Sequence, residues 1–432
     1  MPTTMLITMC LGFALSISVA VSIGIAALLG TWMSNVSMLL AVKEMYSSIN
    51  KFPLAAVPFF ILAGNLMETG GISRRLVEFA KSVVGGVQGG LSATCVLTCM
   101  IFAAVSGSSV ATTFAIGVIL IPALVRHGYP KNYAAALQAA AAELGVIIPP
   151  SIPMIIYGVS AEVSIGELFI AGIGPGILIS AALMAFVLIY ARFKGYGKQD
   201  REGRLPFLTA TRRAAFALLM PVIILGGIYG GIFTPTEASV VAVVYALIIG
   251  LIVHRELSFA DLGPIITKSV ISSTVILFII ANAGLFSYLI TRAGVPDQIG
   301  EFLRATLDSP FMFLLGVNTA LFIIGMFIET SAAIIVLAPI LAPVAVSFGI
   351  DPVHFGLIMV VNLALGMITP PFGVNLFAAC TVARISVDAI IPRLLPFVLV
   401  VLACLMLITY VPQISLGLRD LVYPQAAIMP AR

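Results

Sequence analysis

The sequence predicts an all-α polytopic membrane protein built from two inverted structural repeats, each with a re-entrant hairpin and a broken transmembrane helix. Three observations lead to this prediction. The chain is far more apolar than a soluble protein, a stretch with a Pro-Pro pair occurs twice, and the charges beside the two copies differ in sign.

The composition sets the class of protein. The 432 residues are 61% hydrophobic and only 9% charged, whereas in soluble domains about a quarter of the residues are charged. Apolar runs long enough to span a bilayer recur from the N-terminus to about residue 411, and no gap between them could hold a soluble domain. The first run, 5–29, is too long and too weakly basic at its start for a cleaved signal peptide, so it predicts one or two retained spans. We therefore expect a multi-pass protein surrounded by a lipid bilayer.

Several function classes are disfavoured by the sequence. The net charge of +4 comes from basic residues in loops between spans, which membrane orientation explains better than binding to nucleic acid. The chain contains no G-x-x-x-x-G-K-[ST] motif for ATP phosphates and no H-E-x-x-H zinc motif. The spans also contain no nucleophile–base or metal-ligand set. Neither an ATP-driven pump nor an intramembrane enzyme fits this sequence.

An internal repeat is anchored by two similar stretches, L-G-V-I-I-P-P-S at 144–151 and L-G-M-I-T-P-P-F at 365–372. Pro149 and Pro370 are 370 − 149 = 221 positions apart, and this offset aligns both the Leu-Gly and the Pro-Pro pairs without a gap. The repeat covers roughly 60–190 and 278–412. Internal symmetry of this kind is typical of secondary transporters.

The charges beside the two copies predict that the repeats are inverted. Basic residues dominate before the first hairpin region, with Arg74, Arg75 and Lys81, whereas the segment before the second carries more acidic residues. The acidic residues of that second segment are Asp297, Glu301 and Asp308. The joining segment 191–213 holds seven Lys or Arg against two acidic residues, so the positive-inside rule places it in the cytoplasm.

These landmarks divide the chain into six parts. Residues 1–59 are expected to form N-terminal scaffold helices, 191–213 a cytoplasmic linker, 214–277 further scaffold helices and 413–432 a C-terminal tail. The first repeat, 60–190, contains a hairpin at about 91–126 and a broken helix at about 132–160; the second, 278–412, contains a hairpin at about 309–347 and a broken helix at about 352–382. Within the scaffold, Thr234-Pro235-Thr236-Glu237 fits a capping box and predicts a helix start.

Each hairpin is indicated by small and polar residues that interrupt a long apolar stretch. The first interruption is Ser106–Ser109, and the second runs from Gly325 to Ser331. Non-helical backbone at membrane depth persists only against protein or water, which favours a hairpin tip that reaches the middle of the membrane. The alternative is a continuous helix whose Ser and Gly residues pack against neighbours. The inverted-repeat context favours hairpins.

The Pro-Pro pairs predict the two helix breaks and a use for them. Because proline has no N–H, Pro149 and Pro150 should release the carbonyls of Gly145 and Val146, and the second pair should release those of Gly366 and Met367. Each new half-helix would begin with proline near N1, where free N–H groups suit an anion. Neutral oxygens of this kind suit Na⁺ better than Ca²⁺ or Mg²⁺, and two repeats imply at least two sites.

Proton coupling would instead need a titratable group in the membrane. Glu329 is the first candidate and Glu143 the second. For Glu329, an equally good reading is a carboxylate bonded to amides of the hairpin tip. Asn375 lies one turn past the second break, where it could contact a substrate.

Five stretches together resemble a known family. They are A-G-N-L-M-E-T-G-G-I at 63–72, V-S-G-S-S at 105–109, G-G-I-F-T-P-T-E-A at 230–238, and the two Pro-Pro stretches. In these stretches the chain resembles the large membrane subunit, DctM-like or SiaM-like, of tripartite ATP-independent periplasmic (TRAP) transporters. The resemblance covers nearly the whole chain.

The resemblance implies an elevator-type, sodium-coupled importer of an organic acid in the bacterial inner membrane. The solute would be a C4-dicarboxylate, sialic acid or a similar carboxylate. The family also implies two partners, a small four-helix membrane subunit and a periplasmic substrate-binding protein. This chain shows no small-subunit segment, so a separate subunit is expected. The alternative function is a stand-alone sodium/dicarboxylate symporter.

By the same resemblance, the sodium ligands fall at each hairpin tip and the helix break beside it. The expected Na⁺ residues are Ser106, Gly107, Ser108, Ser109, Gly145, Val146, Ile148, Pro149, Pro150, Gly325, Glu329, Thr330, Ser331, Gly366, Met367, Thr369 and Pro370. The expected substrate-binding residues are Ser109, Thr112, Ser151, Pro371 and Asn375.

Overall fold

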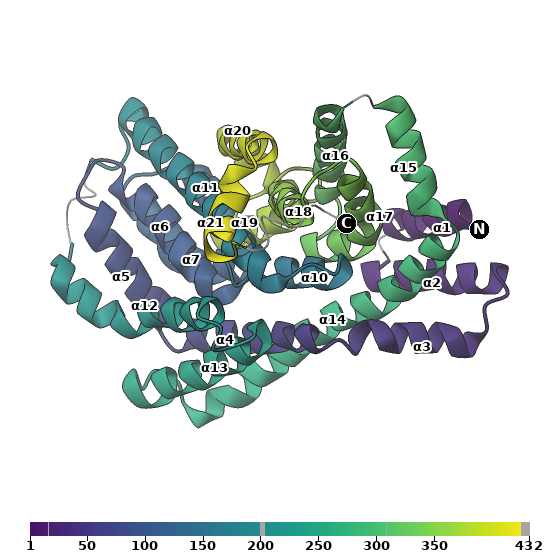
Figure 1. Ribbon diagram of the computed structural model, residues 1–432. Coiled ribbons are helices and arrows are strands. Elements are labelled where there is room, and N and C mark those ends of the chain that lie inside the picture. The colour runs from purple at the N-terminus through teal and green to yellow at the C-terminus, as the bar shows by residue number, and fades with distance from the viewer. Residues whose placement is uncertain (16, 199–203, 308, 425–432) are drawn as a thin grey trace.

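The computed structural model describes residues 1–15, 17–198, 204–307 and 309–424. All regular structure in these residues is helical (Figure 1). The first half contains α1 (Pro2–Ala14), α2 (Val19–Met33), α3 (Met38–Ile49), η1 (Phe52–Ala55), α4 (Ala56–Thr69), α5 (Ile72–Val84), α6 (Gly90–Ser106), α7 (Ser109–Arg126), α8 (Lys131–Ala142), α9 (Leu144–Ile147), α10 (Ile152–Ser160) and α11 (Ile165–Lys194). The second half contains α12 (Phe207–Tyr229), α13 (Pro235–Ile248), η2 (Ile249–Val253), α14 (Phe259–Arg292), α15 (Val295–Thr306), α16 (Pro310–Gly325), α17 (Thr330–Ser347), α18 (Pro352–Met367), α19 (Val374–Ala383), α20 (Val387–Tyr410) and α21 (Gln413–Val422).

The helices confirm the prediction of an all-α protein with several membrane spans. Among the described residues, eight helices are long and apolar enough to cross a membrane, or nine if one bent pair counts as a span. In Figure 1 the ends of α5, α11 and α12 lie at the left of the molecule, and α15 lies at the right. The basic and the acidic segments of the sequence are therefore at opposite ends of the structure.

The N-terminal apolar run differs from the expected one or two spans. It forms α1 and α2, which have 13 and 15 residues, whereas a span needs about 20. The interruption has a local cause, because the Ser18 hydroxyl caps α2 by accepting a hydrogen bond from the Val21 N–H. The two short helices pack closely, and a methyl group at Gly12 would collide with Ser22.

Helix starts recur at the offset that the sequence predicted. The second helices of the two helix pairs, α7 and α17, begin 330 − 109 = 221 positions apart, and α8 and α18 begin 352 − 131 = 221 apart. The long helices that follow, α11 and α20, begin 387 − 165 = 222 apart. The sequence boundaries at 60 and 278 lie inside α4 and α14, so the repeats begin within continuous helices.

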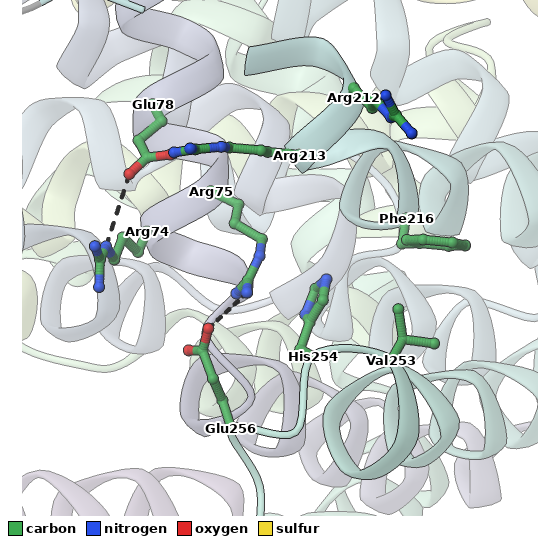
Figure 2. A pocket seen from close by; sticks show the side chains of 9 residues that line it. All are labelled: Arg74, Arg75, Glu78, Arg212, Arg213, Phe216, Val253, His254 and Glu256. Carbon is green, nitrogen blue, oxygen red and sulfur yellow. Dashed lines mark ion pairs between the residues drawn. The ribbon is translucent and has the colours of Figure 1, made fainter. Parts of the chain in front are cut away.

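The joining segment is shorter than the expected linker 191–213. Helix α11 continues to Lys194 and α12 begins at Phe207, so Arg212 and Arg213 are helical. Figure 2 shows Arg213 reaching toward Glu78 of α5. Residues 199–203, which include some of the linker charges, lie outside the described residues. The capping box of α13 is confirmed, because Thr234 and Glu237 bond to each other's backbone.

The core centres on α8 and α18, which precede the two breaks. Every residue of α18 from Val353 to Met367 is buried, as is every residue of α8 from Tyr133 to Ala142. A helix that is apolar on nearly all sides is suited to complete burial. Both helices consist mostly of Ala, Leu, Ile and Val, and their buried polar side chains, Gln138, His354 and Asn362, each form a hydrogen bond inside the protein. The helices that precede the two breaks are therefore enclosed by the rest of the protein.

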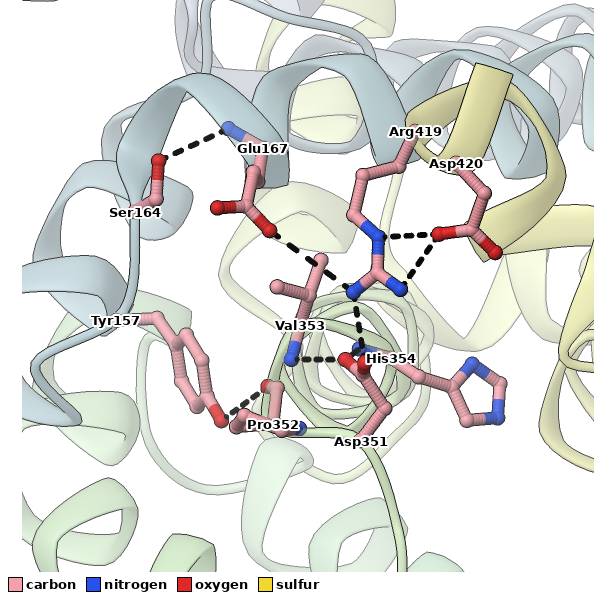
Figure 3. A network of polar contacts seen from close by, with 9 residues as sticks. All are labelled: Tyr157, Ser164, Glu167, Asp351, Pro352, Val353, His354, Arg419 and Asp420. Atoms are coloured by element: carbon pink, nitrogen blue, oxygen red, sulfur yellow. Dashed lines mark hydrogen bonds and ion pairs between the residues drawn. The ribbon is translucent and has the colours of Figure 1, made fainter. Parts of the chain in front are cut away.

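Residues 413–422 of the expected C-terminal tail form α21, which contacts α11 of the first half and α18 of the second, and residues 425–432 lie outside the described residues. Arg419 of α21 is buried and lies 2.7 Å from Asp351, 2.6 Å from Asp420 and 3.9 Å from Glu167 (Figure 3). Nearby, the Tyr157 hydroxyl of α10 donates to the Pro352 carbonyl at the start of α18. Glu167 of α11 and Asp351 at the start of α18 are thus paired with one arginine.

Candidate functional site

The first hairpin tip is built around Gly107. Helix α6 ends at Ser106 and α7 begins at Ser109, and between them Gly107 has φ +63°, a conformation that favours glycine. Ser108 then caps α7, because its hydroxyl accepts a hydrogen bond from the Ala111 N–H at 3.4 Å. The two helices are therefore separated by a tight reversal of the chain.

The first helix break lies between Ile147 and Ile152, where the two helical parts are bent by 43°. Ser151 caps α10 and also donates to the Val146 carbonyl at 2.5 Å. The expectation that proline leaves this carbonyl free was wrong, because the serine hydroxyl takes the place of the missing N–H. The proline at the start of the new half-helix is Pro153, not Pro149 or Pro150.

The first tip and the first break are in direct contact. The Ile152 N–H donates to the Gly107 carbonyl at 3.3 Å, and a Cβ on Gly145 would lie 2.7 Å from the Ser108 carbonyl oxygen. Ser106 and Thr112 hydroxyls bond to each other at 2.9 Å. The buried Ser109 hydroxyl has no hydrogen-bond partner among the described residues. This oxygen is therefore available as a ligand, and hard cations such as Na⁺ prefer oxygen ligands.

The second tip and break are also in contact, through a different set of groups. A Cβ on Gly366 would lie 2.8 Å from the carbonyl oxygen of Gly325, so the end of α18 packs against the end of α16 without a side chain between them. The Thr330 hydroxyl lies 2.9 Å from the Met367 sulfur. The structure thus brings together the tip and break residues expected from the second repeat.

Two details of the second break differ from the expectation. The Gly366 carbonyl is not free, because it accepts a hydrogen bond from the Thr369 N–H at 2.9 Å. The Thr369 hydroxyl in turn donates to the Leu365 carbonyl at 2.8 Å. The half-helix α19 begins at Val374 after Gly373, so no proline occupies its first turn. Pro370 and Pro371 therefore end one helix without starting the next.

Glu329 caps the helix that follows the second tip. Its carboxylate accepts hydrogen bonds from the Ala332 N–H at 3.1 Å and from the Ser331 hydroxyl at 2.9 Å. A carboxylate at a helix N-terminus is stabilised by the unpaired N–H groups and the helix dipole. Of the two readings of Glu329, this geometry supports the one in which the tip amides hold the carboxylate.

A buried polar junction joins the two halves beside the breaks. The Asn375 amide donates to the Glu143 carboxylate at 2.7 Å and to the Ala139 carbonyl at 3.1 Å, and it accepts a hydrogen bond from Thr113. The second carboxylate oxygen of Glu143 has no partner among the described residues. The junction connects α7 and α8 of the first half with α19 of the second.

A cavity of about 360 Å³ lies between the first hairpin tip and helices α4 and α14. Its polar lining comprises Ser106 and Ser108 of the tip, Asn65 and Glu68 of α4, and Lys268 and Ser272 of α14. The Lys268 ammonium lies 3.3 Å from the Glu68 carboxylate. Pockets for small organic molecules are typically about 300–1,000 Å³ with a few polar groups that fix orientation. This cavity could hold a small anion against the lysine.

The expected substrate residues lie elsewhere in this conformation. Ser109, Thr112, Ser151 and Asn375 are buried, and Pro371 is exposed on the second break. None of the five lines the cavity, whereas Ser106 and Ser108, expected as sodium ligands, do. The sequence reasoning missed Asn65, Glu68 and Lys268. A lone lysine within the apolar run of α14 was the available signal, since an ionisable residue in a span usually has a function.

Comparison with protein families decides the class of transporter. Residues 4–414 match the family described as "Tripartite ATP-independent periplasmic transporter, DctM component". The chain belongs to this family. The resemblance inferred from the sequence is confirmed, and so is a multi-pass location in the cytoplasmic membrane. The DctM family is a family of transporter permeases, not of enzymes, and TRAP transport is independent of ATP, as expected.

Two relatives show how similar the chain is to individual TRAP permeases. It is 44% identical over 381 residues to the C4-dicarboxylate TRAP transporter large permease protein DctM of Pseudomonas aeruginosa, covering 88% of this chain and 89% of the relative. It is also 44% identical over 402 residues to the isethionate TRAP transporter permease protein DctMQ of Oleidesulfovibrio alaskensis. That match covers 93% of this chain and 63% of the relative.

A solved structure supports the fold. The YdaH transporter of Alcanivorax borkumensis superposes with a TM-score of 0.63 and 16% sequence identity. The match covers 87% of this chain and 88% of YdaH. At this identity the likeness concerns the fold alone.

Proposed function

We propose that this TRAP permease is the large subunit of a sodium-coupled transporter that imports an organic acid across the bacterial inner membrane. The observation that carries the proposal is the cavity beside the first hairpin tip. There Lys268 offers a positive charge for a carboxylate, next to Ser106 and Ser108. The solute class is a C4-dicarboxylate, sialic acid or a similar carboxylate, in keeping with the name of the Pseudomonas relative.

Sodium would be held at the two contacts between a tip and a break. In the first half the residues are Ser106–Ser109 with Gly145–Pro150, and in the second Gly325–Ser331 with Gly366–Pro370. Bound Na⁺ would supply positive charge that draws each tip toward its break and favours an anion nearby. The protein's own part would be to supply hydroxyl and carbonyl oxygens at these contacts, and the buried Ser109 hydroxyl has no hydrogen-bond partner among the described residues.

The inverted repeats suggest how access alternates. We place the basic end with Lys198 in the cytoplasm and the acidic end with Asp297 in the periplasm, so the two hairpins enter from opposite sides. The cavity lies between the first hairpin and helices α4 and α14. A solute held there changes sides if the hairpins and broken helices move as a body along the scaffold, which is an elevator mechanism.

Labelling of single cysteines tests this topology. In a background without the five native cysteines, a cysteine at Asp297 should react with an impermeant maleimide on intact cells from which the outer membrane has been removed. A cysteine at Lys198 should react only after permeabilisation, because the positive-inside rule keeps it in the cytoplasm. Both positions are exposed, so accessibility from one side is the deciding variable. Equal labelling of both positions on intact cells would contradict the inverted arrangement.

Two protein partners complete the proposed transporter. A separate four-helix small subunit would cover part of the apolar surface, of which Trp32 and Leu39 are 78% and 81% exposed, and lipid would cover the rest. The isethionate permease DctMQ of Oleidesulfovibrio alaskensis is longer than this chain, because the match covers 93% of this chain but only 63% of that protein. A periplasmic binding protein would dock on the acidic end, where Asp297 and Glu301 of α15 are exposed. Asp308, expected on the same surface, lies outside the described residues.

Reconstitution tests the whole proposal. Liposomes that contain this chain and its small subunit should import almost no solute until both Na⁺ and the binding protein are added. Import should rise more steeply than first order with Na⁺ because the sites are duplicated. The charge reversal Asp297→Lys with Glu301→Lys should reduce the stimulation by the binding protein, most strongly at low salt.

Two outcomes would overturn parts of the proposal. Robust import without a binding protein would favour the stand-alone sodium/dicarboxylate symporter. Full import without Na⁺, driven by a proton gradient, would move the coupling role to a carboxylate such as Glu143 or Glu329.

A further inference from the structure

A second cavity lies at the basic end of the molecule. It has a volume of about 330 Å³ and lies between α5, α12 and the end of η2 (Figure 2). Its charged lining consists of Arg74, Arg75, Glu78, Arg212, Arg213 and Glu256. Four arginines against two glutamates leave a formal charge of 4 − 2 = +2. None of the features proposed for transport uses this cavity.

The ion pairs in the cavity leave guanidinium N–H groups available to bind an anion. Arg75 is bound closely to Glu256 at 2.6 Å, whereas Glu78 is shared at longer range by Arg74 at 3.7 Å and Arg213 at 3.6 Å. No described residue forms an ion pair with Arg212. A lone carboxylate shared by two arginines satisfies few of their N–H donors, since each guanidinium carries five.

His254 does not add to the positive charge at neutral pH. Burial and the neighbouring Arg75 lower the pKa of His254 below its ordinary value, which favours the neutral ring. Its ring and that of Phe216 form a T-shaped pair with centroids 6.5 Å apart, and its Nδ1 lies 3.3 Å from the Gly70 carbonyl oxygen. The excess charge in the cavity is therefore due to arginine, the side chain best suited to bind phosphate oxygens in pairs.

One wall of the cavity is apolar and open to the outside. Phe216 and Val253 line the cavity and are each 42% exposed. On α12, Leu208 lies one turn before Arg212 and is 79% exposed. A basic site bordered by exposed apolar side chains matches a lipid whose headgroup is anionic and whose acyl chains lie alongside. Basic pockets between membrane helices on the cytoplasmic side are known to suit such headgroups.

We infer that this cavity binds the phosphate group of an anionic phospholipid from the surrounding membrane. The arginines hold the phosphate oxygens, and the acyl chains lie along Phe216 and Val253. Because α5 belongs to the segment before the first hairpin while α12 and η2 belong to the scaffold, the bound lipid links the two. A free inorganic phosphate shares the headgroup chemistry but lacks the apolar part.

Binding of short-chain lipids to the purified complex of this chain and its small subunit tests the inference. The probes are dioctanoylphosphatidylglycerol, dioctanoylphosphatidylcholine and inorganic phosphate, and the measurement is native mass spectrometry with titration of each probe. We expect phosphatidylglycerol to bind at least about tenfold more tightly than phosphatidylcholine, since the choline group compensates the phosphate charge. Inorganic phosphate should bind weakly or not at all.

Variants locate the site. Arg212→Gln should weaken phosphatidylglycerol binding about tenfold, and Arg212→Lys should retain part of it, because lysine keeps the charge but loses the paired geometry. The matched control is Arg192→Gln with Lys194→Gln, which removes two exposed charges from the same end of the molecule outside the cavity. This control should change binding less than twofold. Because Arg212 has no ion pair to lose among the described residues, its variants should keep the Tm of the lipid-free complex.

Three results would overturn the inference. The first is equal loss of binding in the Arg212 variant and the control, which would indicate a general surface effect. The second is phosphatidylcholine binding as tight as phosphatidylglycerol binding. The third is inorganic phosphate binding as tight as either lipid, which would make the cavity a site for a free anion.

Discussion

Replacing Lys268 by glutamine is expected to raise the solute concentration needed for half-maximal import about tenfold. Lys268 is the cation of the cavity beside the first hairpin tip, and glutamine is a shorter polar side chain without a charge. A hydrogen bond to a charged group contributes about 1.5–3 kcal/mol net. The lower end applies here, because the lysine side chain is 62% exposed, and about 1.4 kcal/mol is a factor of ten. Initial import rates in liposomes, with Na⁺ and the binding protein present, give the solute concentration for half-maximal import.

Two further variants make this result specific. Lys43→Gln removes an exposed lysine of α3 that does not line the cavity, and it should leave import unchanged. Glu68→Gln removes the carboxylate that lies 3.3 Å from Lys268 and competes with the solute for it, so the KM should fall. If Lys268→Gln and Lys43→Gln gave the same KM, the cavity would not be the solute site, although sodium coupling could still hold.

Local sequence signals predicted the elements that carry the candidate sites. A glycine between serines marked the first hairpin tip, and the conformation at Gly107 shows why glycine is needed there. The paired prolines marked both breaks, because two adjacent residues without an N–H remove two hydrogen bonds from the helix. Single prolines such as Pro122 and Pro175 lie inside continuous helices and mark no break. The capping box at Thr234 was equally local. Each of these signals depends on residues within about one helical turn of each other.

The same local signals could not predict which polar groups remain without a hydrogen bond. Proline removes a donor, but Ser151 restores a hydrogen bond to Val146, and the Thr369 N–H occupies the Gly366 carbonyl. Whether a nearby hydroxyl turns back to the helix depends on its rotamer and its packing. The prolines therefore indicated where the helices break and left open which oxygens face a cation.

The remaining features depend on contacts between distant parts of the chain. Glu68 and Lys268 are 200 positions apart, and Glu143 and Asn375 are 232 apart. Arg419 reaches Asp351 from a segment that looked like a polar tail. Charge alone does not pair such residues, because any of several acids could be the partner. The fold brings each pair together, so the cavity and the junction became visible only in the structure.

Replacing Gly366 by alanine is expected to abolish most sodium-driven import. The substitution has two opposing effects on the stability of the contact between the second tip and its break. Within a helix, alanine is favoured over glycine by about 0.5–1 kcal/mol, because glycine loses more backbone freedom on folding. Against this, the added Cβ would lie 2.8 Å from the Gly325 carbonyl oxygen and closer still to its other backbone atoms. Overpacking of this kind costs about 1–3 kcal/mol, and backbone cannot rotate away as a side chain can. The cost of overpacking should therefore exceed the gain in helix propensity, and the second tip at Gly325 should move away from the break at Gly366.

The measurements are the Tm in detergent and the Na⁺ dependence of import, with Gly316→Ala as the matched control. Gly316 is also helical, but a Cβ there would meet nothing within 4 Å, so alanine should leave import unchanged and raise the Tm slightly. Gly366→Ala should reduce import at least about tenfold and shift the Na⁺ dependence to higher concentration, because in the proposed mechanism the second tip and its break hold Na⁺ together. Gly145→Ala should do the same at the first site, where a Cβ would lie 2.7 Å from the Ser108 carbonyl oxygen. If Gly366→Ala instead behaved like Gly316→Ala, the close contact between the second tip and its break would not be part of the transport cycle.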